Sequence, residues 1–131
     1  MSGGHLETGR WGEREAERHL RGKGCRILGR RVRVGTRDEL DLVARDGDTL
    51  VFVEVKTRGG ERYGAPRTAV DSRKRHALSR AAVRYLGALK YPAVCYRFDV
   101  VEVIGSPSDG VEAIRHIESA FTLDPRYTPP Y

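Results

Sequence analysis

The chain has 131 residues, enough for one domain with a sizeable hydrophobic core and too few for a second. Lysine and arginine number 24 against 18 acidic residues, and the formal charge of +6 and pI near 9.7 favour a polyanionic partner while leaving DNA, RNA and acidic proteins open. The lack of an apolar run long enough to cross a bilayer, and of an apolar leader segment, argues against a membrane protein and makes the cytoplasm the expected compartment.

A helix and three strands are predicted for the first half of the chain. After a short flexible tail over residues 1–8, the helix runs from about Thr8 to Lys23 and is ended by Gly22 and Gly24. Strands are expected at about 26–34, 38–44 and 50–56, and the Asp-Gly-Asp turn at 46–48 joins the last two. Their spacing predicts an antiparallel meander.

A loop, a long helix and one or two strands are predicted for the second half. The glycine-containing loop spans 58–66, and the helix follows from about Thr68 to Leu89, ahead of Pro92. A strand at 93–104, a turn at 105–110 and a short edge strand at 111–117 precede a tail over residues 121–131. This order predicts one α/β domain over residues 9–120, with helices packed against a sheet.

The sequence Glu54-Val55-Lys56, at the end of the apolar third strand, carries the clearest sign of chemistry. Side chains two apart on a strand point the same way, so Glu54 and Lys56 share one face and Val55 takes the other. On the neighbouring strand Glu39 and Asp41 are predicted to share a face. Acidic side chains beside an ammonium group indicate a metal-dependent centre. The opposite face of that neighbouring strand is predicted to carry Leu40, Leu42 and Ala44.

Helical phase adds an acidic residue from the first helix. Glu13 lies three and seven positions before Ala16 and Leu20, so it shares their inward stripe, where a carboxylate needs a partner. Glu17 lies one step further round the helix and is the fallback for the same role. We therefore expect Glu13, or failing it Glu17, to join the centre at Asp41.

These residue types fit phosphodiester hydrolysis. Mg²⁺ prefers carboxylate oxygens and keeps several waters, so Asp41 and Glu54 converging from adjacent strands make a plausible site. The cation would lower the pKa of a bound water, and Lys56 would hold that water or neutralise developing charge. Glu13 would complete the cluster, while Glu39 fits either a supporting or a structural role. The competing interpretation is a solvated strand face, because Glu-x-Lys is common by chance.

A basic face on the second helix predicts contact with a phosphate backbone. Lys74 follows Val70 and precedes Leu78 by four positions each, so it is expected inward or at the rim; the alternative is an extended side chain that reaches solvent. The adjacent face carries a basic ridge at helical spacing, formed by Arg73, His76, Arg80 and Arg84. This ridge fits a solvated face equally well. The expected nucleic-acid-binding residues are Arg58, Arg73, Lys74, Arg80 and Arg84.

The motifs resemble those of the YraN family of small bacterial proteins. The resemblance spans roughly residues 9–103. That family is similar to archaeal Holliday-junction resolvases and belongs to the PD-(D/E)xK nuclease superfamily, which implies a restriction-endonuclease-like fold with a central mixed sheet. The motifs that carry the resemblance are Gly12-Glu13, Glu39-Leu40-Asp41-Leu42-Val43, Val51-Phe52-Val53-Glu54-Val55-Lys56-Thr57-Arg58, Tyr63-Gly64 and Lys74.

The resemblance also implies a site and an assembly. Because the resolvases work as dimers, it admits a homodimer. The chain departs from the family at Asp38, where relatives usually have glycine. This departure leaves the conformation of the local turn undetermined but does not affect the expected metal ligands. For the site, the resemblance implies Mg²⁺ or Mn²⁺ held by Asp41, Glu54 and the Val55 carbonyl, with Lys56 catalytic and Glu13 matching the helix-borne acid of the resolvases.

Three functions are compatible with these features. The first is a metal-dependent endonuclease acting on nucleic acid, with DNA favoured and branched DNA a candidate substrate. The second is a non-catalytic nucleic-acid-binding module that keeps the nuclease fold without turnover. The third is a protein-interaction domain whose basic surface meets an acidic partner, against which salt-sensitive DNA binding would count.

Overall fold

The computed structural model describes residues 2–59, 70–90 and 94–124, with side chains described from residue 7 onward. The order of elements is helix, three strands, helix, two strands, and it confirms the predicted α/β class and element order. The elements are α1 (Ser2–Gly22), β1 (Arg26–Val34), β2 (Asp38–Asp46), β3 (Thr49–Arg58), α2 (Ser72–Ala88), β4 (Cys95–Ser106) and β5 (Gly110–Phe121).

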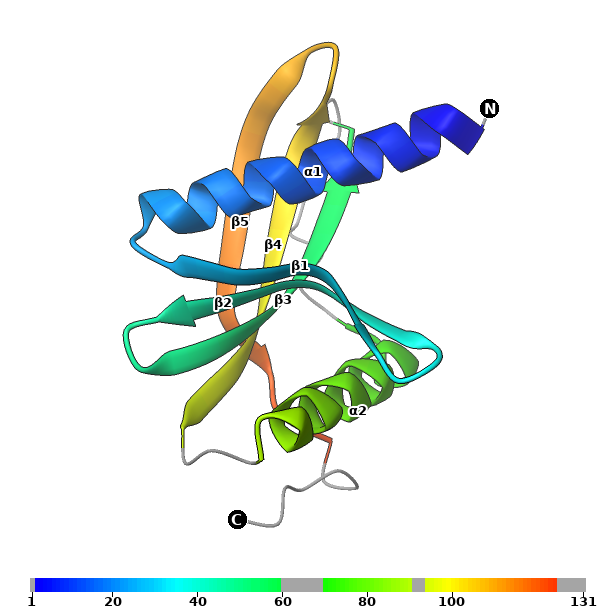
Figure 1. The fold of residues 1–131 in the computed structure, drawn as a ribbon. Coiled ribbons are helices and arrows are strands. Elements are labelled where there is room, and N and C mark those ends of the chain that lie inside the picture. Colours follow the sequence, from blue (N-terminus) through cyan, green and yellow to red (C-terminus); the bar gives the residue numbers. More distant parts are fainter. Residues whose placement is uncertain (1, 60–69, 91–93, 125–131) are drawn as a thin grey trace.

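The strands that the structure describes form one mixed sheet in the order β1-β2-β3-β4-β5. The first three form the predicted antiparallel meander, and β5 pairs antiparallel with β4. β3 and β4 run parallel, and parallel neighbours need a long crossover connection. α2 lies in that crossover (Figure 1).

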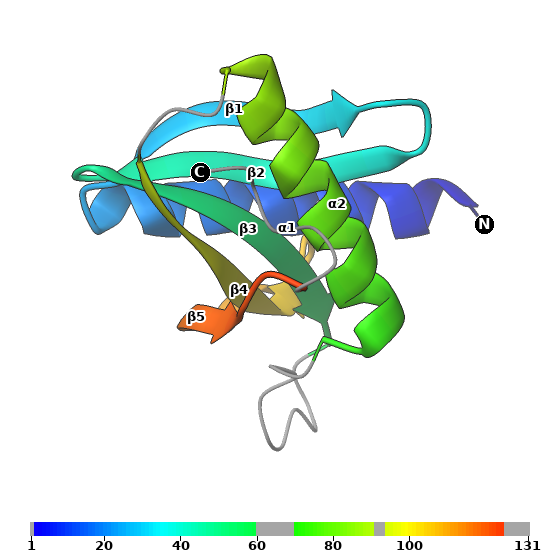
Figure 2. The ribbon, with the colours of Figure 1, turned by 90° about the horizontal axis from the view of Figure 1, so that it is seen from below.

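One helix covers each face of the sheet (Figure 2). Residues 50–53 of the central strand β3 are apolar on both faces: Val51 and Val53 pack in the cluster that contains the α1 side chains, while Leu50 and Phe52 pack in the cluster that contains those of α2. A stretch of strand buried on both sides has no polar face, and this explains the continuous apolar run at these positions. Val55, two residues after Val53, also packs on the α1 side.

α1 packs closely against the end of β3. Buried Trp11, Ala16 and Leu20 form the inward stripe of the helix. At Gly12 an added Cβ would collide with the side chain of Thr57, so a glycine is needed for this close approach. The contact fixes how near the next residue of the helix, a predicted site residue, comes to the sheet.

The helix boundaries differ from the predicted ones at their N-terminal ends. α1 begins at Ser2, inside the predicted flexible tail of residues 1–8, and it ends at Gly22, one residue before the predicted Lys23. α2 begins only at Ser72, because the Asp71 side chain accepts a hydrogen bond from the Lys74 backbone N–H (2.8 Å) and caps the helix there. Neither described helix is long and apolar enough to span a membrane.

The C-terminal strands extend further along the chain than predicted. β4 continues to Ser106, and β5 runs to Phe121 instead of stopping at Ile117. β5 stays paired with β4 over this length, and the rings of Phe121 and Phe98 stack with centroids 4.7 Å apart. The predicted loop at 58–66 and the C-terminal end of the predicted tail fall largely outside the described residues.

Candidate functional site

The candidate site lies where β2 and β3 separate. The antiparallel ladder between these strands ends at the pair Leu42↔Val53. One further step of the same register would set Asp41 opposite Glu54. The Asp41 Oδ2 accepts a hydrogen bond from the Val55 backbone N–H at 2.9 Å. The aspartate side chain therefore satisfies an N–H of β3 beyond the end of the ladder, and this bond holds it beside the glutamate.

The side chains of β2 change direction on either side of Asp41. Leu42 and Ala44 pack on the α1 side of the sheet, but Leu40 packs in the cluster with α2. The prediction that these three share one face is therefore wrong for Leu40. Before Leu42 the strand pairs with β1 alone, and such two-stranded ribbons twist strongly; this one bends toward α2 (Figure 1).

Asp41 and Glu54 form a carboxylate pair whose charges repel. Burial, the charge of Glu54 and a hydrogen bond between the two carboxyl groups raise the pKa of Asp41 to about 7. The Val55 N–H and Lys74 oppose this rise. Glu54 is itself buried, with only 9% of its surface exposed. A proton or a cation placed between the two groups would relieve the repulsion.

Two lysines belong to the same part of the structure. Lys74, at the start of α2, places its Nζ 3.4 Å from Glu54 Oε2, with the side chain half exposed at the rim of the site. Lys56 is partly buried and, two residues after Glu54 on β3, points to the same face. Among the described residues Lys56 has no hydrogen-bonded or ionic partner. Of these two ammonium groups, that of Lys74 pairs with a carboxylate, and that of Lys56 has no such partner among the described residues.

Glu13 reaches the neighbourhood of Asp41 from α1, as its helical phase predicts. Burial and the charge of Asp41 raise the pKa of Glu13, and Arg31 counteracts them. The Arg31 Nε donates to Glu13 Oε1 at 2.8 Å. Exposed Glu39 adds a smaller effect in the same direction as Asp41, so both of these acids lie within electrostatic reach of Glu13.

Glu17, the fallback for Glu13, faces a different set of groups. Arg30 binds both of its carboxylate oxygens, at 2.6 and 2.8 Å, and Arg21 donates a third bond at 2.9 Å. The bonds from Arg30 hold the pKa of Glu17 below its usual value. These contacts tie α1 to β1 and give no support to a role beside Asp41.

The donor set at the centre suits a hard divalent cation. Across residues 2–59, 70–90 and 94–124, no three Asp, Glu, His or Cys side chains are gathered closely enough to form a metal cage. Glu13 bonds to Arg31 and does not complete one. Two carboxylates still fit Mg²⁺, which is commonly bound through one or two carboxylates and keeps several waters. The raised pKa of Asp41 marks the charge that such an ion would neutralise.

The basic ridge predicted on α2 takes part in holding the fold together. Arg80 donates from Nε and Nη2 to the two carboxylate oxygens of Asp38, each at 2.7 Å, with both side chains largely buried. The Arg84 guanidinium lies against Gly35, where a Cβ would collide with it. Asp38 thus begins β2 as the partner of an α2 arginine.

Of the other residues predicted to bind nucleic acid, Arg58 is paired within the fold and Arg73 is exposed. Arg58 Nε lies 3.0 Å from Glu102 Oε2, a fully buried carboxylate on β4. His76 of the ridge lies 3.4 Å from Asp124. Arg73, in the first turn of α2, is exposed to solvent.

Sequence reasoning missed two residues that shape the site. Arg31, which holds Glu13, adopts a φ of 47°, a conformation that few residues other than glycine take. It follows an irregularity in the β1 ladder between Ile27 and Gly29, and no sequence pattern pointed to it. Gly12 left a usable signal, because a glycine directly before an inward acid suggests a close helix–sheet contact.

Comparisons with known proteins agree with one another. Residues 12–103 match the model of Uncharacterised protein family UPF0102. A UPF0102 protein of Symbiobacterium thermophilum is 49% identical over 115 residues, which cover 87% of this chain and 95% of the relative. UPF0102 proteins of Frankia casuarinae and Pelotomaculum thermopropionicum are 46% and 44% identical; each alignment covers 86% of this chain, and 94% and 93% of the respective relatives. The matched range contains Glu13, Asp41, Glu54 and Lys56.

Proposed function

The chain belongs to the UPF0102 (YraN) family, and on that premise we propose that it hydrolyses phosphodiester bonds of nucleic acid, with DNA favoured, using Mg²⁺ or Mn²⁺. The observation that carries the proposal is the pair of Asp41 and Glu54. Burial and mutual repulsion raise the pKa of Asp41 to about 7. Such a pair is a cation-binding arrangement, because a divalent ion relieves the repulsion.

In the proposed site Asp41, Glu54 and the Val55 carbonyl would hold the ion. The chemistry supplied by a bound Mg²⁺ or Mn²⁺ is neutralisation of the attacked phosphate and a lowered pKa for water. Lys56, on the face of Glu54 and without an ionic partner among the described residues, orients the attacking water or stabilises charge on the phosphate. Lys74, 3.4 Å from Glu54, holds that carboxylate in place.

Glu13 has a positioning role in this proposal. Its carboxylate is kept in place by Arg31 at 2.8 Å and lies within electrostatic reach of Asp41. From there it would order water around the ligands, as acidic groups behind a metal commonly do. The close approach of α1 at Gly12 sets its distance from the sheet.

A cleavage panel tests the function. Linear, nicked, flapped and four-way DNA, and RNA, are incubated with the protein and each divalent cation. Wild type is compared with Asp41→Asn and Glu54→Gln, and Asp48→Asn serves as the matched control because Asp48 is fully exposed in the β2–β3 turn. We expect metal-dependent cleavage by wild type and the control, and none by the two site variants.

Robust cleavage by both site variants would refute the assigned centre. Preference for the four-way substrate would support the structure-selective form of the proposal, which rests on the resemblance to the resolvases. A homodimer, proposed on the same ground, is tested by light scattering on the protein without DNA.

A specific observation also favours the second candidate, a nucleic-acid-binding module without turnover. The described residues hold no group of three metal-binding side chains, and Lys74 already compensates part of the charge of Glu54. Under this alternative, wild type and both carboxylate variants bind DNA equally and in a salt-dependent way, and the cleavage panel stays blank with every cation.

A further inference from the structure

A groove runs between α1 and β1 on the side of the sheet away from α2. Its volume is about 600 Å³. Two carboxylates, Glu13 and Glu17, and the apolar Leu42 form part of its wall. The rest of the wall is basic, and consists of Arg10, Arg14, Arg18, Arg21, Arg30 and Arg31. None of these arginines is among the residues that the sequence predicted to bind nucleic acid.

The groove keeps a positive charge after its internal ion pairs are counted. Glu17 is bound by Arg30 and Arg21, and Glu13 is bound by Arg31. No acidic side chain among the described residues pairs with Arg10 or Arg14, and both are exposed. Arg18 pairs with Glu15, which does not line the groove. Two lining carboxylates therefore stand against six guanidinium groups, and those of Arg10 and Arg14 are available to an anionic ligand.

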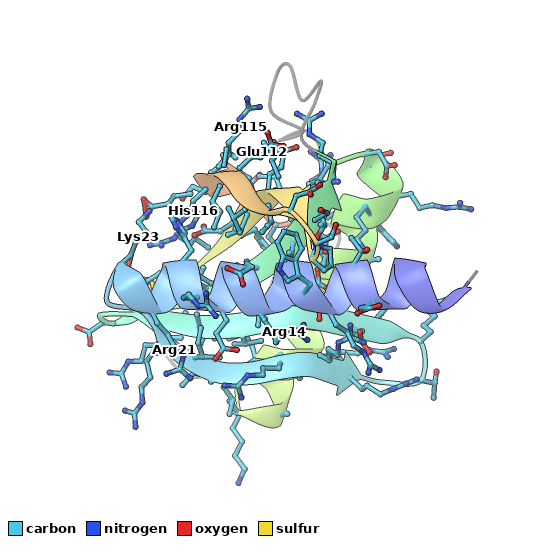
Figure 3. All side chains as sticks on the ribbon, turned by 90° about the horizontal axis from the view of Figure 1, so that it is seen from above. Arg14, Arg21, Lys23, Glu112, Arg115 and His116 are labelled. Atoms are coloured by element: carbon cyan, nitrogen blue, oxygen red, sulfur yellow. The ribbon has the colours of Figure 1, made fainter. Side chains whose placement is uncertain are left out.

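The arginines of α1 form a line along the groove. Positions 10, 14, 18 and 21 follow helical spacing, so their side chains leave the same side of the helix. Figure 3 shows Arg14 and Arg21 on the β1 side of α1, whereas Lys23 and His116 lie on its other side. At 1.5 Å per residue the line is about 16 Å long, which matches about five phosphates of one strand at about 3.4 Å of helix axis each.

The groove leads to the carboxylate pair. Glu13 lines the groove, and the charge of Asp41 raises the pKa of its carboxyl group. Leu42, another lining residue, directly follows Asp41 in β2. A strand lying in the groove would thus meet the acidic centre at one end. On α2, by contrast, Arg80 is bound to a buried aspartate.

We propose that the groove between α1 and β1 binds the sugar–phosphate backbone of the nucleic acid and leads it to the carboxylate pair. The inference rests on the proposed function for the choice of ligand. Guanidinium groups suit phosphate because their planar donors bond to two oxygens at once. Contacts of this kind position a strand without reading its sequence, so binding in the groove is sequence-independent and salt-dependent.

Binding is measured apart from cleavage. Fluorescence anisotropy of labelled single-stranded and four-way DNA is recorded in EDTA over a series of NaCl concentrations. The test variant is Arg10→Gln with Arg14→Gln, which removes two cations without breaking a described ion pair. The control, Arg26→Gln with Arg45→Gln, removes the same charge from two exposed cross-strand neighbours that do not line the groove.

The groove variant is expected to bind DNA about tenfold more weakly and to reduce the slope of log K against log salt by about 1.5, whereas the control stays near wild type. Equal binding by the two variants overturns the inference. So does equal displacement of DNA from wild type by polyglutamate of matched charge, because the groove would then accept any polyanion, including an acidic protein. Weak binding by the groove variant together with a blank cleavage panel would remove the hydrolytic function and leave the groove.

Discussion

Asp41→Asn is expected to stabilise the protein at alkaline pH. In wild type, burial and the charge of Glu54 raise the pKa of Asp41 from 3.8 to about 7. One pKa unit corresponds to about 1.4 kcal/mol, so keeping Asp41 ionised costs at most about 4 kcal/mol, or about 2–3 kcal/mol once solvent screening at this partly exposed residue is included. Asparagine removes the charge and still accepts the Val55 N–H.

The expected gain depends on pH in a defined direction. The folded pKa lies above the unfolded one, so between about pH 4 and pH 7 the folded protein keeps a proton that the unfolded chain has lost. This contribution to wild-type stability is complete below about pH 4 and is lost as the pH rises through about 7. Asp41→Asn does not lose stability in this way as the pH rises. The free energies of unfolding of the two proteins therefore converge near pH 4 and differ by about 2–3 kcal/mol at pH 8.

Urea unfolding in EDTA between about pH 5 and pH 8.5 measures the difference. Asp48→Asn is the control, since the same substitution at a fully exposed turn residue is expected to change the free energy of unfolding by less than about 0.5 kcal/mol. The reasoning is refuted if Asp41→Asn is no more stable than wild type at alkaline pH, or if its advantage persists unchanged in acid.

Three further substitutions probe the surroundings of the pair. Gly12→Ala is expected to cost about 1–3 kcal/mol in thermal or urea unfolding because its Cβ meets a β3 side chain, whereas Gly9→Ala, with open space around it, is expected to stabilise α1 by up to about 1 kcal/mol; equal effects would contradict the close contact. Arg80→Ala leaves a buried carboxylate without its partner and is expected to cost about 3 kcal/mol in urea at neutral pH, with a smaller loss in acid as that carboxylate takes up a proton. Lys74→Gln removes a cation that lowers the pKa of Asp41, so the acidic limb of the pH–rate profile should move to higher pH; a shift to lower pH would exclude this coupling.

Local pattern was enough to predict the fold and one half of the site. The apolar run of β3 predicted a strand there, and strand alternation set Glu54 and Lys56 on one side. The turn at 46–48 fixed the register that brings Asp41 opposite Glu54. Helical phase turned Glu13 toward the sheet.

The rest depends on contacts between distant parts of the chain, which a local pattern does not contain. The side-chain direction of Leu40 follows the twist of the β1–β2 ribbon after it leaves β3. The ion pairs of Arg58 and Arg80 join residues more than forty positions apart, so both were assigned to the basic surface. Arg31 requires a positive φ that its residue type does not favour.

The separation of β2 and β3 also gives a physical reason for the position of the carboxylate pair. While the ladder continues, the backbone groups of both strands are paired with each other. Beyond the pair Leu42↔Val53 the Asp41 side chain accepts the hydrogen bond of a β3 backbone N–H instead. The two carboxylates therefore come together on strands, which are more rigid than a loop. The site is therefore held by the same hydrogen bond that ends the strand pair.

Titration calorimetry of Mn²⁺ in two buffers of different ionisation enthalpy examines the Asp41–Glu54 pair itself. Because Asp41 titrates near pH 7, ion binding at that pH should release about half a proton, and close to none near pH 8.5. Asp41→Asn and Glu54→Gln should abolish the binding, and Asp48→Asn should leave it unchanged. If wild type binds no Mn²⁺, or if the two site variants bind it as wild type does, the pair is not a cation site and the hydrolytic proposal fails with it.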